Sequence, residues 1–399
     1  MMPEIKYVES KDKTTCFGCS ACTAACRFDA IRLEPDEEGF LYPEIDREKC
    51  TECGACARAC PYGENKLIHA ETLTAYALQA ADAAQLVASS SGAAFALLAE
   101  STLKEGGWVC GCAFDDGYRA QHIVTNEPGS IDAMRGSKYV QSDMGDCFRE
   151  IARLLSSGDR VLFSGTPCQV AGLRSFLGRE WSKLVTVDLV CHGVPSSRLL
   201  DAYLASERES KGEIVSFRFR DKGRNGWCSN GTVEWVSKSG GRKRRRTSPY
   251  DDTYYYYYLA NSVSRECCYV CPFARLGRVS DLTIGDYWNA EEAELSFDCT
   301  MGTSAVLVNT EKGGIALRAI EGRAHLEEVS VGHVAQGNGN LTAPSPRPPL
   351  RDAVYEAIAE EGYRAASARL CKLRPMVPLL RRLIPKRLKK IAKRLVNGR

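Results

Sequence analysis

With 399 residues, of which 44% are hydrophobic and 26% charged, and a net charge of only +3, the chain can bury one big core or two smaller ones, which excludes disorder as its default state. It contains no run of about 18 apolar residues, and its first residues lack the apolar core of a signal peptide, so we expect a cytoplasmic protein. Disulfide frameworks are typical of short secreted chains, so the nineteen cysteines indicate metal or cluster ligands instead.

Two runs of four cysteines near the N-terminus share the pattern C-x2-C-x2-C-x3-C. Three thiolates at this spacing bind three corners of one cubane, and the fourth cysteine of each run binds the other cluster. The pattern therefore predicts two [4Fe–4S] clusters in a bacterial-ferredoxin-like domain over residues 8–70. The expected ligands of one cluster are Cys16, Cys19, Cys22 and Cys60. Those of the other are Cys50, Cys53, Cys56 and Cys26.

Small residues between the cysteines, such as Gly18 and Gly54, let backbone amides approach the sulfurs. A pair of four-cysteine zinc sites is the alternative, because zinc ligands also occur as C-x2-C. Zinc does not require a third and fourth cysteine at this spacing in both runs, so clusters are favoured. The second run ends in the expected Pro61, whereas Arg27 follows Cys26 and departs from the pattern.

The segment at 71–102 is rich in alanine and apolar on one face, which predicts two helices around a Ser-Gly break. Farther along, residues 160–164 predict a buried strand, 165–168 a tight loop and 169–177 a helix. Residues 184–190 repeat this plan, with a loop at 191–195 and a helix capped by Ser196 or Ser197. Two such units in succession indicate a partly parallel sheet with ligands at the carboxyl ends of its strands.

Residues 213–241 alternate between apolar and polar side chains and end in a Ser-Gly-Gly turn, as antiparallel strands do. The fold class is therefore α+β, with a mixed, partly parallel sheet. The charge run RKRRR at 242–246 is interpreted as a solvated loop. A docking patch for an acidic partner or for an anionic cofactor tail is the alternative.

Six motifs follow one another after residue 130. They are RGSKYVQS at 135–142, GTPCQ at 165–169, DLVCHGVPS at 188–196, CYVCPF at 268–273, SDLTIGDYW at 280–288 and GTSAVLVNT at 302–310. Together they resemble the coenzyme F420 hydrogenase/dehydrogenase beta-subunit family, with the ferredoxin-like domain in front, as the similar hydroxymethyl-chlorophyll reductases also show. The resemblance implies a flavin-binding domain over residues 71–345, with FAD and a third [4Fe–4S] cluster.

The resemblance places the ligands of the third cluster on Cys168, Cys191, Cys268 and Cys271. The residues agree with this grouping, because Cys168 and Cys191 each follow a predicted strand at the same sheet edge and the other two form a C-x2-C chelate. Cys267 is an alternative to Cys268 as a ligand. For Cys168 and Cys191, the alternative is that they are buried structural thiols. The remaining cysteines are unassigned, and the close pair at 110 and 112 is expected to serve packing.

For a flavin, the RGSKY segment offers positive charge and hydrogen bonds to pyrophosphate and ring carbonyls, and Gly165 and Thr166 open a helix whose N-terminus can hold a phosphate. A Gly-Ser-Lys turn alone does not identify FAD, so the identity of the cofactor depends on the resemblance. The expected cofactor-binding residues are Arg135, Gly136, Ser137, Lys138, Tyr139, Gly165, Thr166, Gly285, Asp286, Gly302, Thr303 and Ser304.

His192 is the only one of five histidines inside a motif, which makes it the candidate catalytic proton donor to substrate or flavin. A hydrogen bond to a cluster sulfur is the alternative role.

The C-terminal segment, 346–399, differs in composition from the rest. Residues 350–370 predict one amphipathic helix. Residues 372–399 contain eleven Lys or Arg and no Asp or Glu, and subtracting these eleven charges from +3 leaves −8 on the remainder. Apolar residues after Pro385 fall on one helical face, which suits a peripheral anchor on anionic lipid or a helix docked on an acidic partner. A frayed solvated tail and docking on the acidic body are the alternatives.

These patterns predict an iron–sulfur flavoprotein oxidoreductase. Ferredoxin or another redox protein would exchange electrons with the N-terminal clusters, and FAD would exchange hydride with an F420-like deazaflavin or another small molecule. No nucleic-acid partner is expected. A non-catalytic electron-transfer subunit of a larger redox complex is the alternative.

Overall fold

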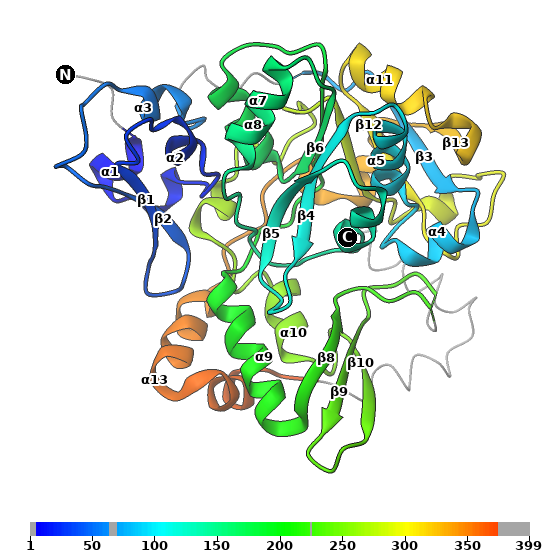
Figure 1. Cartoon of the computed structure of the whole chain (residues 1–399). Coiled ribbons are helices and arrows are strands. Elements are labelled where there is room, and N and C mark those ends of the chain that lie inside the picture. The colour runs from blue at the N-terminus through cyan, green and yellow to red at the C-terminus, as the bar shows by residue number, and fades with distance from the viewer. Residues whose placement is uncertain (1–4, 64–69, 224–225, 374–399) are drawn as a thin grey trace.

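The computed structural model describes residues 5–63, 70–223 and 226–373 (Figure 1). The strands of these ranges form a two-stranded, a three-stranded and an eight-stranded sheet. The short 3-10 helices are Lys13–Thr15, Pro128–Ser130, Glu266–Val270, Ala290–Glu292, Glu321–Arg323 and Gly339–Leu341. No helix in the described ranges is long and apolar enough to cross a membrane.

The N-terminal module folds around the two cysteine runs. Its elements are α1 (Lys6–Ser10), α2 (Ala21–Ala25), β1 (Ile31–Pro35), β2 (Leu41–Ile45) and α3 (Ala55–Ala59). The two strands pair antiparallel, and α2 and α3, of five residues each, begin in the same way. Ser20 and Gly54, which precede them, both adopt the left-handed conformation, with φ of 64° and 69°. The sequence repeat is therefore also a repeat of backbone geometry, and a ferredoxin-like N-terminal region is confirmed.

The large sheet has the strand order β13-β3-β12-β11-β7-β6-β4-β5. Its strands are β3 (Thr74–Ala80), β4 (Trp108–Phe114), β5 (Ala120–Thr125), β6 (Val161–Gly165), β7 (Leu184–Leu189), β11 (Leu282–Asp286), β12 (Ser304–Val308) and β13 (Ala324–Val329). The four central strands β4, β6, β7 and β11 are parallel, and the other strands join antiparallel. The prediction of a mixed, partly parallel sheet is confirmed.

Helices cover both faces of this sheet (Figure 1). They are α4 (Ala83–Ala88), α5 (Ala94–Lys104), α6 (Ile131–Met134), α7 (Cys147–Ser156), α8 (Pro167–Leu177), α11 (Glu311–Arg318) and α12 (Val331–Gly337). Strand β6 is buried throughout, with Phe163 in the core formed with α7 and α8 and Leu162 in the core formed with α5. The two strand-loop-helix units are confirmed, although α8 begins at Pro167, so that Cys168 lies in its first turn.

The prediction of two helices over 71–102 is wrong in its first part. Residues 74–80 form β3, which pairs with β12 and β13, and the helices begin only after Asp82, whose side chain caps α4. Ala77 and Leu78 are fully buried and belong to the cores on opposite faces of the sheet. Alanine favours helices, so tertiary packing has overridden local propensity in this strand.

Below the large sheet in Figure 1 lies a second lobe. It contains α9 (Ser197–Lys211), β8 (Gly212–Arg218), β9 (Gly231–Ser237), β10 (Arg242–Thr247), α10 (Thr253–Leu259) and α13 (Leu350–Leu370). The antiparallel strands and the Ser196 cap of α9 are confirmed. The solvated loop expected at 242–246 is wrong, because these residues form the edge strand β10. Arg242 and Arg244 pair with Glu234 on the neighbouring strand, which offsets their charge.

The helix expected at 350–370 is present but kinks at Gly362, where φ is 80°. Near its start, the buried Arg351 pairs with Glu38 in the loop between β1 and β2, and so holds the N-terminal module against this lobe. The expectations for the basic tail beyond residue 373 lie outside the described residues. The domain boundaries at 8–70, 71–345 and 346–399 stay predictions.

The loop between α4 and α5 is fixed between two strands. The N–H of Gly92 donates to Ser304 Oγ at 2.9 Å, and the Gly92 carbonyl accepts from the N–H of Ala80 at 2.8 Å. A Cβ added to Gly92 would lie 1.9 Å from the Leu78 carbonyl oxygen. Only glycine allows the loop to approach β3 this closely.

We therefore expect Gly92→Ala to lower the free energy of unfolding by about 3 kcal/mol, because the added methyl group meets backbone atoms that cannot move independently. Urea unfolding measures this change. Gly129→Ala is the matched control, since nothing lies within 4 Å of its added Cβ, and it should change stability by no more than about 0.5 kcal/mol. Equal stabilities of the two variants would contradict the packing described here.

Candidate functional site

Four expected ligands of the N-terminal module come together beside α2. This inner group consists of Cys16, Cys19, Cys22 and Cys60. Burial, followed by the Coulomb interaction with the other three thiols, raises the pKa of Cys19 well above its usual value. Burial and the charges of Cys16 and Cys60 raise the pKa of Cys22 in the same way. Such thiols ionise together only when a cationic centre offsets their charge, which is what iron supplies.

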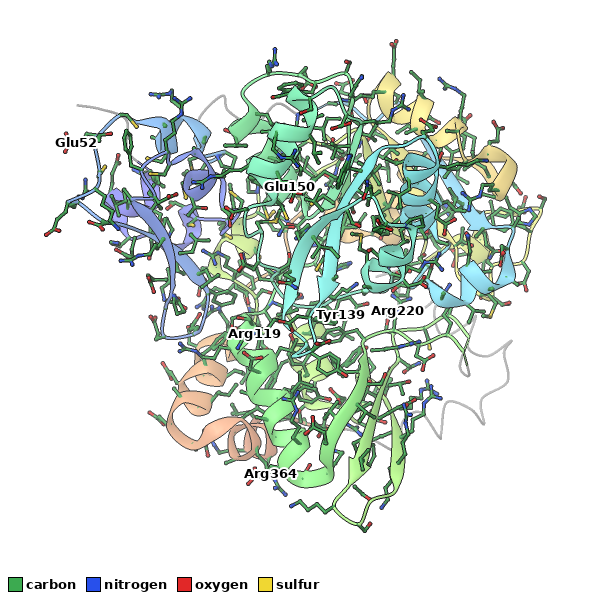
Figure 2. The ribbon with its side chains drawn as sticks, in the orientation of Figure 1. Glu52, Arg119, Tyr139, Glu150, Arg220 and Arg364 are labelled. Carbon is green, nitrogen blue, oxygen red and sulfur yellow. The ribbon has the colours of Figure 1, made fainter. Side chains whose placement is uncertain are left out.

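The other expected ligands of the module form the outer group, which consists of Cys50, Cys53, Cys56 and Cys26. Burial raises the pKa of Cys56, and the nearby Cys50 and Cys26 raise it further. Cys53 is exposed, and the backbone N–H of Ala55 lowers its pKa. The neighbouring Glu52 lies at the end of the module that points away from the rest of the protein (Figure 2). The outer group is therefore the one nearest to solvent.

Four more cysteines converge from three separate segments. This third group consists of Cys168 on α8, Cys191 after β7, and Cys268 and Cys271 near the Glu266–Val270 turn. Burial and then the thiols of Cys268, Cys168 and Cys271 raise the pKa of Cys191. The structure thus brings together the four cysteines that the resemblance implied, while their role as ligands stays a prediction.

Cys267 is buried and hydrogen-bonded to Cys268, so it remains the alternative to that residue. In the described ranges, no three His, Cys, Asp or Glu side chains are close enough to bind a single metal ion. A cubane is wider than a single ion and distributes its four ligands over several irons, so a cluster does not require three side chains close enough to bind one ion.

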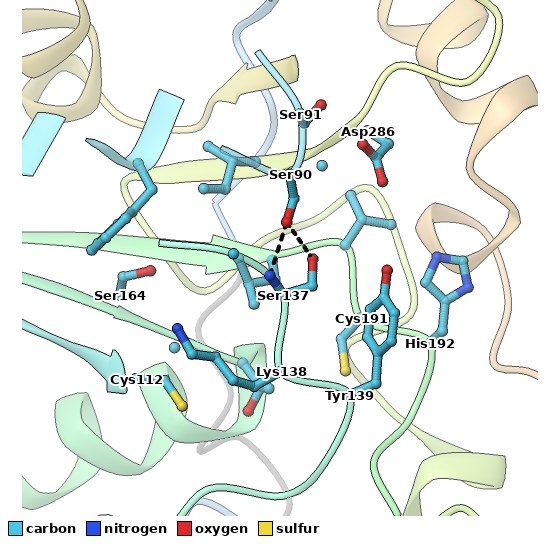
Figure 3. Close-up of a pocket in the computed structure, with 18 of the residues that line it drawn as sticks. Ser90, Ser91, Cys112, Ser137, Lys138, Tyr139, Ser164, Cys191, His192 and Asp286 are labelled. Atoms are coloured by element: carbon cyan, nitrogen blue, oxygen red, sulfur yellow. Dashed lines mark hydrogen bonds between the residues drawn. The ribbon is translucent and has the colours of Figure 1, made fainter. Parts of the chain in front are cut away.

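A cavity of about 390 Å³ lies at the carboxyl ends of β6, β7 and β11. Cys191 of the third group is among its lining residues (Figure 3). Most of the expected cofactor-binding residues line it, namely Arg135, Gly136, Ser137, Lys138, Tyr139, Gly165, Thr166, Gly285, Asp286 and Ser304. Gly302 and Thr303 are not among the lining residues, since Gly302 packs beneath Trp227 and Thr303 is buried. His192 and Cys191 also line the cavity, so one thiol belongs both to the third group and to the cavity wall.

The serine loop at 89–91 forms a wall that the sequence analysis interpreted only as a helix break. Ser90 Oγ accepts hydrogen bonds from the N–H and the hydroxyl of Ser137, at 2.8 and 2.9 Å (Figure 3). Directly after this loop, α5 begins at the cavity without a side-chain cap, because its N-cap residue is Ala93. Free N–H groups at a helix start attract anions. A run of small polar residues before a helix was the signal that could have identified this wall.

The helix start expected to hold a phosphate, that of α8, is partly occupied by its own capping box. The N–H of Thr166 donates to Gln169 Oε1 at 2.9 Å, and Pro167 has no N–H to offer. The charges of the RGSKY segment are also used within the protein. Arg135 pairs with Glu100, and Lys138 Nζ donates to three carbonyls at the end of α6, while burial lowers the pKa of Lys138 to about 8.

A buried hydrogen-bonded chain runs along the floor of the cavity. His122 Nε2 lies 3.0 Å from the Ser164 carbonyl, which can only accept, so Nδ1 accepts from Ser142 Oγ at 3.1 Å. Ser142 Oγ in turn accepts from Gln169 Nε2. Gln169 accepts from Thr166, whose hydroxyl lies 3.1 Å from Cys168 Sγ. The hydrogen bonds thus link the cavity to the third group, and His122, outside every motif, was missed by sequence reasoning.

The opposite wall joins the large sheet to the second lobe. Arg220, which follows β8, donates to Asp286 Oδ2 at 2.8 Å and to the Ser90 carbonyl at 3.1 Å. Tyr139 stacks on Tyr258 with ring centroids 4.5 Å apart. Both Tyr139 and Arg220 lie where the two lobes meet (Figure 2). Nothing in the sequence around Arg220 distinguished it from other charged residues.

Two further residues differ in their surroundings from what the sequence indicated. His192 is exposed at the cavity, and partial desolvation lowers the pKa of its ring, opposed by Asp286. Of the cysteine pair expected to serve packing, Cys110 is buried in the sheet core, but Cys112 lines the cavity.

Burial lowers the pKa of His122 from 6.5 to about 4. Between these values the unfolded chain binds a proton that the folded protein does not, so the free energy of unfolding falls as the pH is lowered from 6.5 toward 4, by up to roughly 3 kcal/mol. Denaturant unfolding across this pH range should therefore show a weaker acid dependence for His122→Gln than for the parent protein. His325→Gln, which changes an exposed histidine on β13, should keep the parent dependence.

Comparisons with known proteins identify the parts of the chain. Residues 158–332 match the model for the C terminus of the beta subunit of coenzyme F420 hydrogenase/dehydrogenase. Two models of 4Fe-4S dicluster domains match residues 15–64 and 42–96. No curated protein matches the chain. A chain of the F420-reducing [NiFe] hydrogenase complex from Methanosarcina barkeri is similar at 17% identity and a TM-score of 0.42, over 76% of this chain and 92% of that one.

The family match contains the third group of cysteines and the carboxyl ends of β6, β7 and β11, and the dicluster match contains the inner and outer groups. The chain is therefore an iron–sulfur protein in which a 4Fe-4S dicluster module at residues 15–64 is followed by a region, residues 158–332, that belongs to the family of the C terminus of the coenzyme F420 hydrogenase/dehydrogenase beta subunit.

Proposed function

We propose that this chain is an iron–sulfur flavoprotein oxidoreductase with three [4Fe–4S] clusters and one FAD, which exchanges hydride with an F420-like deazaflavin or another small molecule. The observation that carries the proposal is the position of Cys191, which belongs to the third group and also lines the cavity. A redox cofactor in the cavity would therefore be next to a cluster on the third group. Such a juxtaposition is what conversion between one-electron and two-electron chemistry requires.

The twelve cysteines fit three clusters in this proposal. Each group is supplied by short loops or helix starts, and the left-handed residues Ser20 and Gly54 orient backbone amides beside the inner and outer groups. Cys22 interacts with both Cys16 and Cys56, so the inner and outer groups are neighbours. The proposed order is therefore outer group, inner group, third group and cavity, with a ferredoxin or another redox protein meeting the exposed outer group.

The size and the lining of the cavity support a flavin as its ligand. Its volume of about 390 Å³ falls within the roughly 300–1,000 Å³ that is usual for small-molecule sites. The uncapped start of α5 and the serine loop offer donors for a pyrophosphate, and Tyr139 and Tyr258 offer an aromatic wall for a planar ring. A flavin held there would supply the conversion between one-electron transfer and hydride transfer.

The residues of the chain would position this chemistry. Ser90 holds the turn at Ser137, which fixes one wall of the cavity. Neutral His122 fixes Ser142, and His192, exposed beside the cavity, is the proposed proton donor to substrate or flavin. We propose domains at 8–70, 71–345 and 346–399, the last as a tail for a partner or an anionic membrane surface.

A non-catalytic electron-transfer role within a larger complex is the second candidate function. It is favoured by the family's own description as a beta subunit, since a protein of this kind can pass electrons to a catalytic partner. Anaerobic assays of the purified chain separate the two functions. Bleaching of its flavin at a catalytic rate by reduced deazaflavin or by NAD(P)H would exclude the purely electron-transferring role and would identify the hydride partner.

The metal content gives a direct prediction. The anaerobically purified chain should contain about twelve irons, an equal amount of sulfide and one FAD. Cys191→Ser should retain only about eight irons, because it removes a ligand of the third group alone. Cys299→Ser, which changes an unassigned cysteine, should retain all of them. About eight irons and no flavin in the parent protein would contradict the proposed function.

A second prediction concerns flavin binding. Ser90→Ala removes the acceptor of two hydrogen bonds from Ser137, so the Kd for FAD should rise about tenfold. Fluorescence titration of the flavin-depleted protein measures this change. Ser156→Ala, which alters an exposed serine on α7, should leave the Kd unchanged.

A further inference from the structure

Arg265 lies between the N-terminal module and the third group of cysteines. Its side chain is fully buried. Its backbone is part of the third group's surroundings, because its N–H donates to the Val194 carbonyl at 3.0 Å and its carbonyl accepts from the N–H of Cys268 at 2.9 Å. The guanidinium points the other way, into the module. Nε donates to the carbonyl of Cys16 at 2.9 Å, and Nη2 donates to the carbonyl of Leu41 at 3.0 Å.

Residues of the N-terminal module pack closely around this guanidinium. The ring of Tyr42 lies 4.0 Å from it, measured from Cζ to the ring centroid. Nη1 donates to Gln141 Oε1, and a Cβ on Gly18 would lie 3.0 Å from Nη1 and 2.5 Å from Gln141 Nε2. Gly18, with φ of +64°, therefore leaves the space that the Arg265 and Gln141 side chains occupy. One arginine thus contacts an inner-group cysteine through its side chain and a third-group cysteine through its backbone.

Arg265 differs from the other buried arginines in its partners. Arg220, Arg278 and Arg351 form ion pairs with Asp286, Asp188 and Glu38. Within the described ranges, Arg265 forms no ion pair with a carboxylate, and its hydrogen-bond acceptors are neutral oxygens. A buried charge without a counter-charge is strongly unfavourable. The ionisable side chains whose Coulomb interaction with Arg265 is strongest are those of Cys16, Cys267, Tyr42 and Cys268.

We propose that Arg265 is the counter-ion shared by the inner cluster and the third cluster, and that its charge raises the reduction potentials of both. Reduction adds one electron to a cluster whose thiolate ligands are already negative, and a nearby cation in a low-dielectric interior stabilises the reduced form. Because the guanidinium is hydrogen-bonded at Cys16 and its Coulomb interaction also reaches Cys268, an electron that leaves one group and arrives at the other stays within its field. Arg265 is therefore a positioning residue for electron transfer, and this inference rests on the proposed clusters.

Redox titration of the full chain, monitored by EPR after anaerobic purification, tests the inference. In Arg265→Gln, the equilibrium constant for reduction should fall about tenfold at the inner and third clusters, a shift of about 59 mV for a one-electron couple. The cluster on the outer group should keep its potential. Arg265→Lys should recover most of the shift, because it restores the charge without the planar fork. Unchanged potentials, or an equal shift of all three, would overturn the proposal.

The matched control is Arg351→Lys, which alters the other buried arginine that ties the module to the body but which faces Glu38 and Glu266 rather than thiols. Its three potentials should equal those of the parent. If Arg265→Gln loses iron, the iron content of Arg265→Lys decides. If Arg265→Lys keeps its full iron content, the charge of Arg265 is what matters. If both variants lose iron, the shape of the side chain is what matters, and the proposal is overturned. About eight irons in the parent protein would instead refute the third cluster itself.

Discussion

The need to offset buried thiolate charge governs the arrangement of this protein. Burial and mutual repulsion raise the pKa values of Cys19 and Cys22 in the inner group and of Cys191 in the third group, so their ionised form depends on cationic centres. The fold answers with short loops that present backbone amides and with a buried arginine that has no carboxylate partner in the described ranges. Two buried arginines hold the N-terminal module in place, because Arg265 joins it to the third group and Arg351 pairs with Glu38 in its loop.

Features that depend on residues close together in the sequence were predictable. Features that depend on contacts between distant segments were not. The cysteine runs and the units around 161–177 and 184–211 were predictable because spacing, caps and buried strands are local signals. Strand β3 was missed because its alanines favour a helix when considered alone, and only its neighbours β12 and β13 make it a strand. His122 and Arg220 reach the cavity from β5 and from the second lobe, and no motif surrounds either of them.

The partners of the basic side chains were also not predictable from the sequence. The sequence predicts that the RGSKY segment offers positive charge to a ligand, yet Arg135 is paired with Glu100 and Lys138 donates to carbonyls at the end of α6. The basic run of β10, for which a docking patch was the alternative interpretation, faces carboxylates. Backbone N–H groups and serine hydroxyls of the 89–93 loop are among the donors at the cavity wall. A ligand in this cavity would therefore be held more by dipoles than by formal charges, so its binding should respond weakly to ionic strength. Composition alone cannot distinguish these two situations.

The large sheet places two kinds of chemistry at one edge. Strands β6 and β7 both end beside the cavity, and the segments that follow them carry Cys168 and Cys191. The same segments therefore form a wall of the cavity and carry two cysteines of the third group. The hydrogen bonds from His122 through Ser142 and Gln169 to Thr166 add an electrostatic link, because the Thr166 hydroxyl donates more strongly to Cys168 when that sulfur is ionised or ligated and to Gln169 otherwise. The charge at the third group is thereby coupled to the hydrogen bonds of the cavity floor. A ligand bound there would meet a polar surface whose donors depend on the state of the neighbouring thiolates.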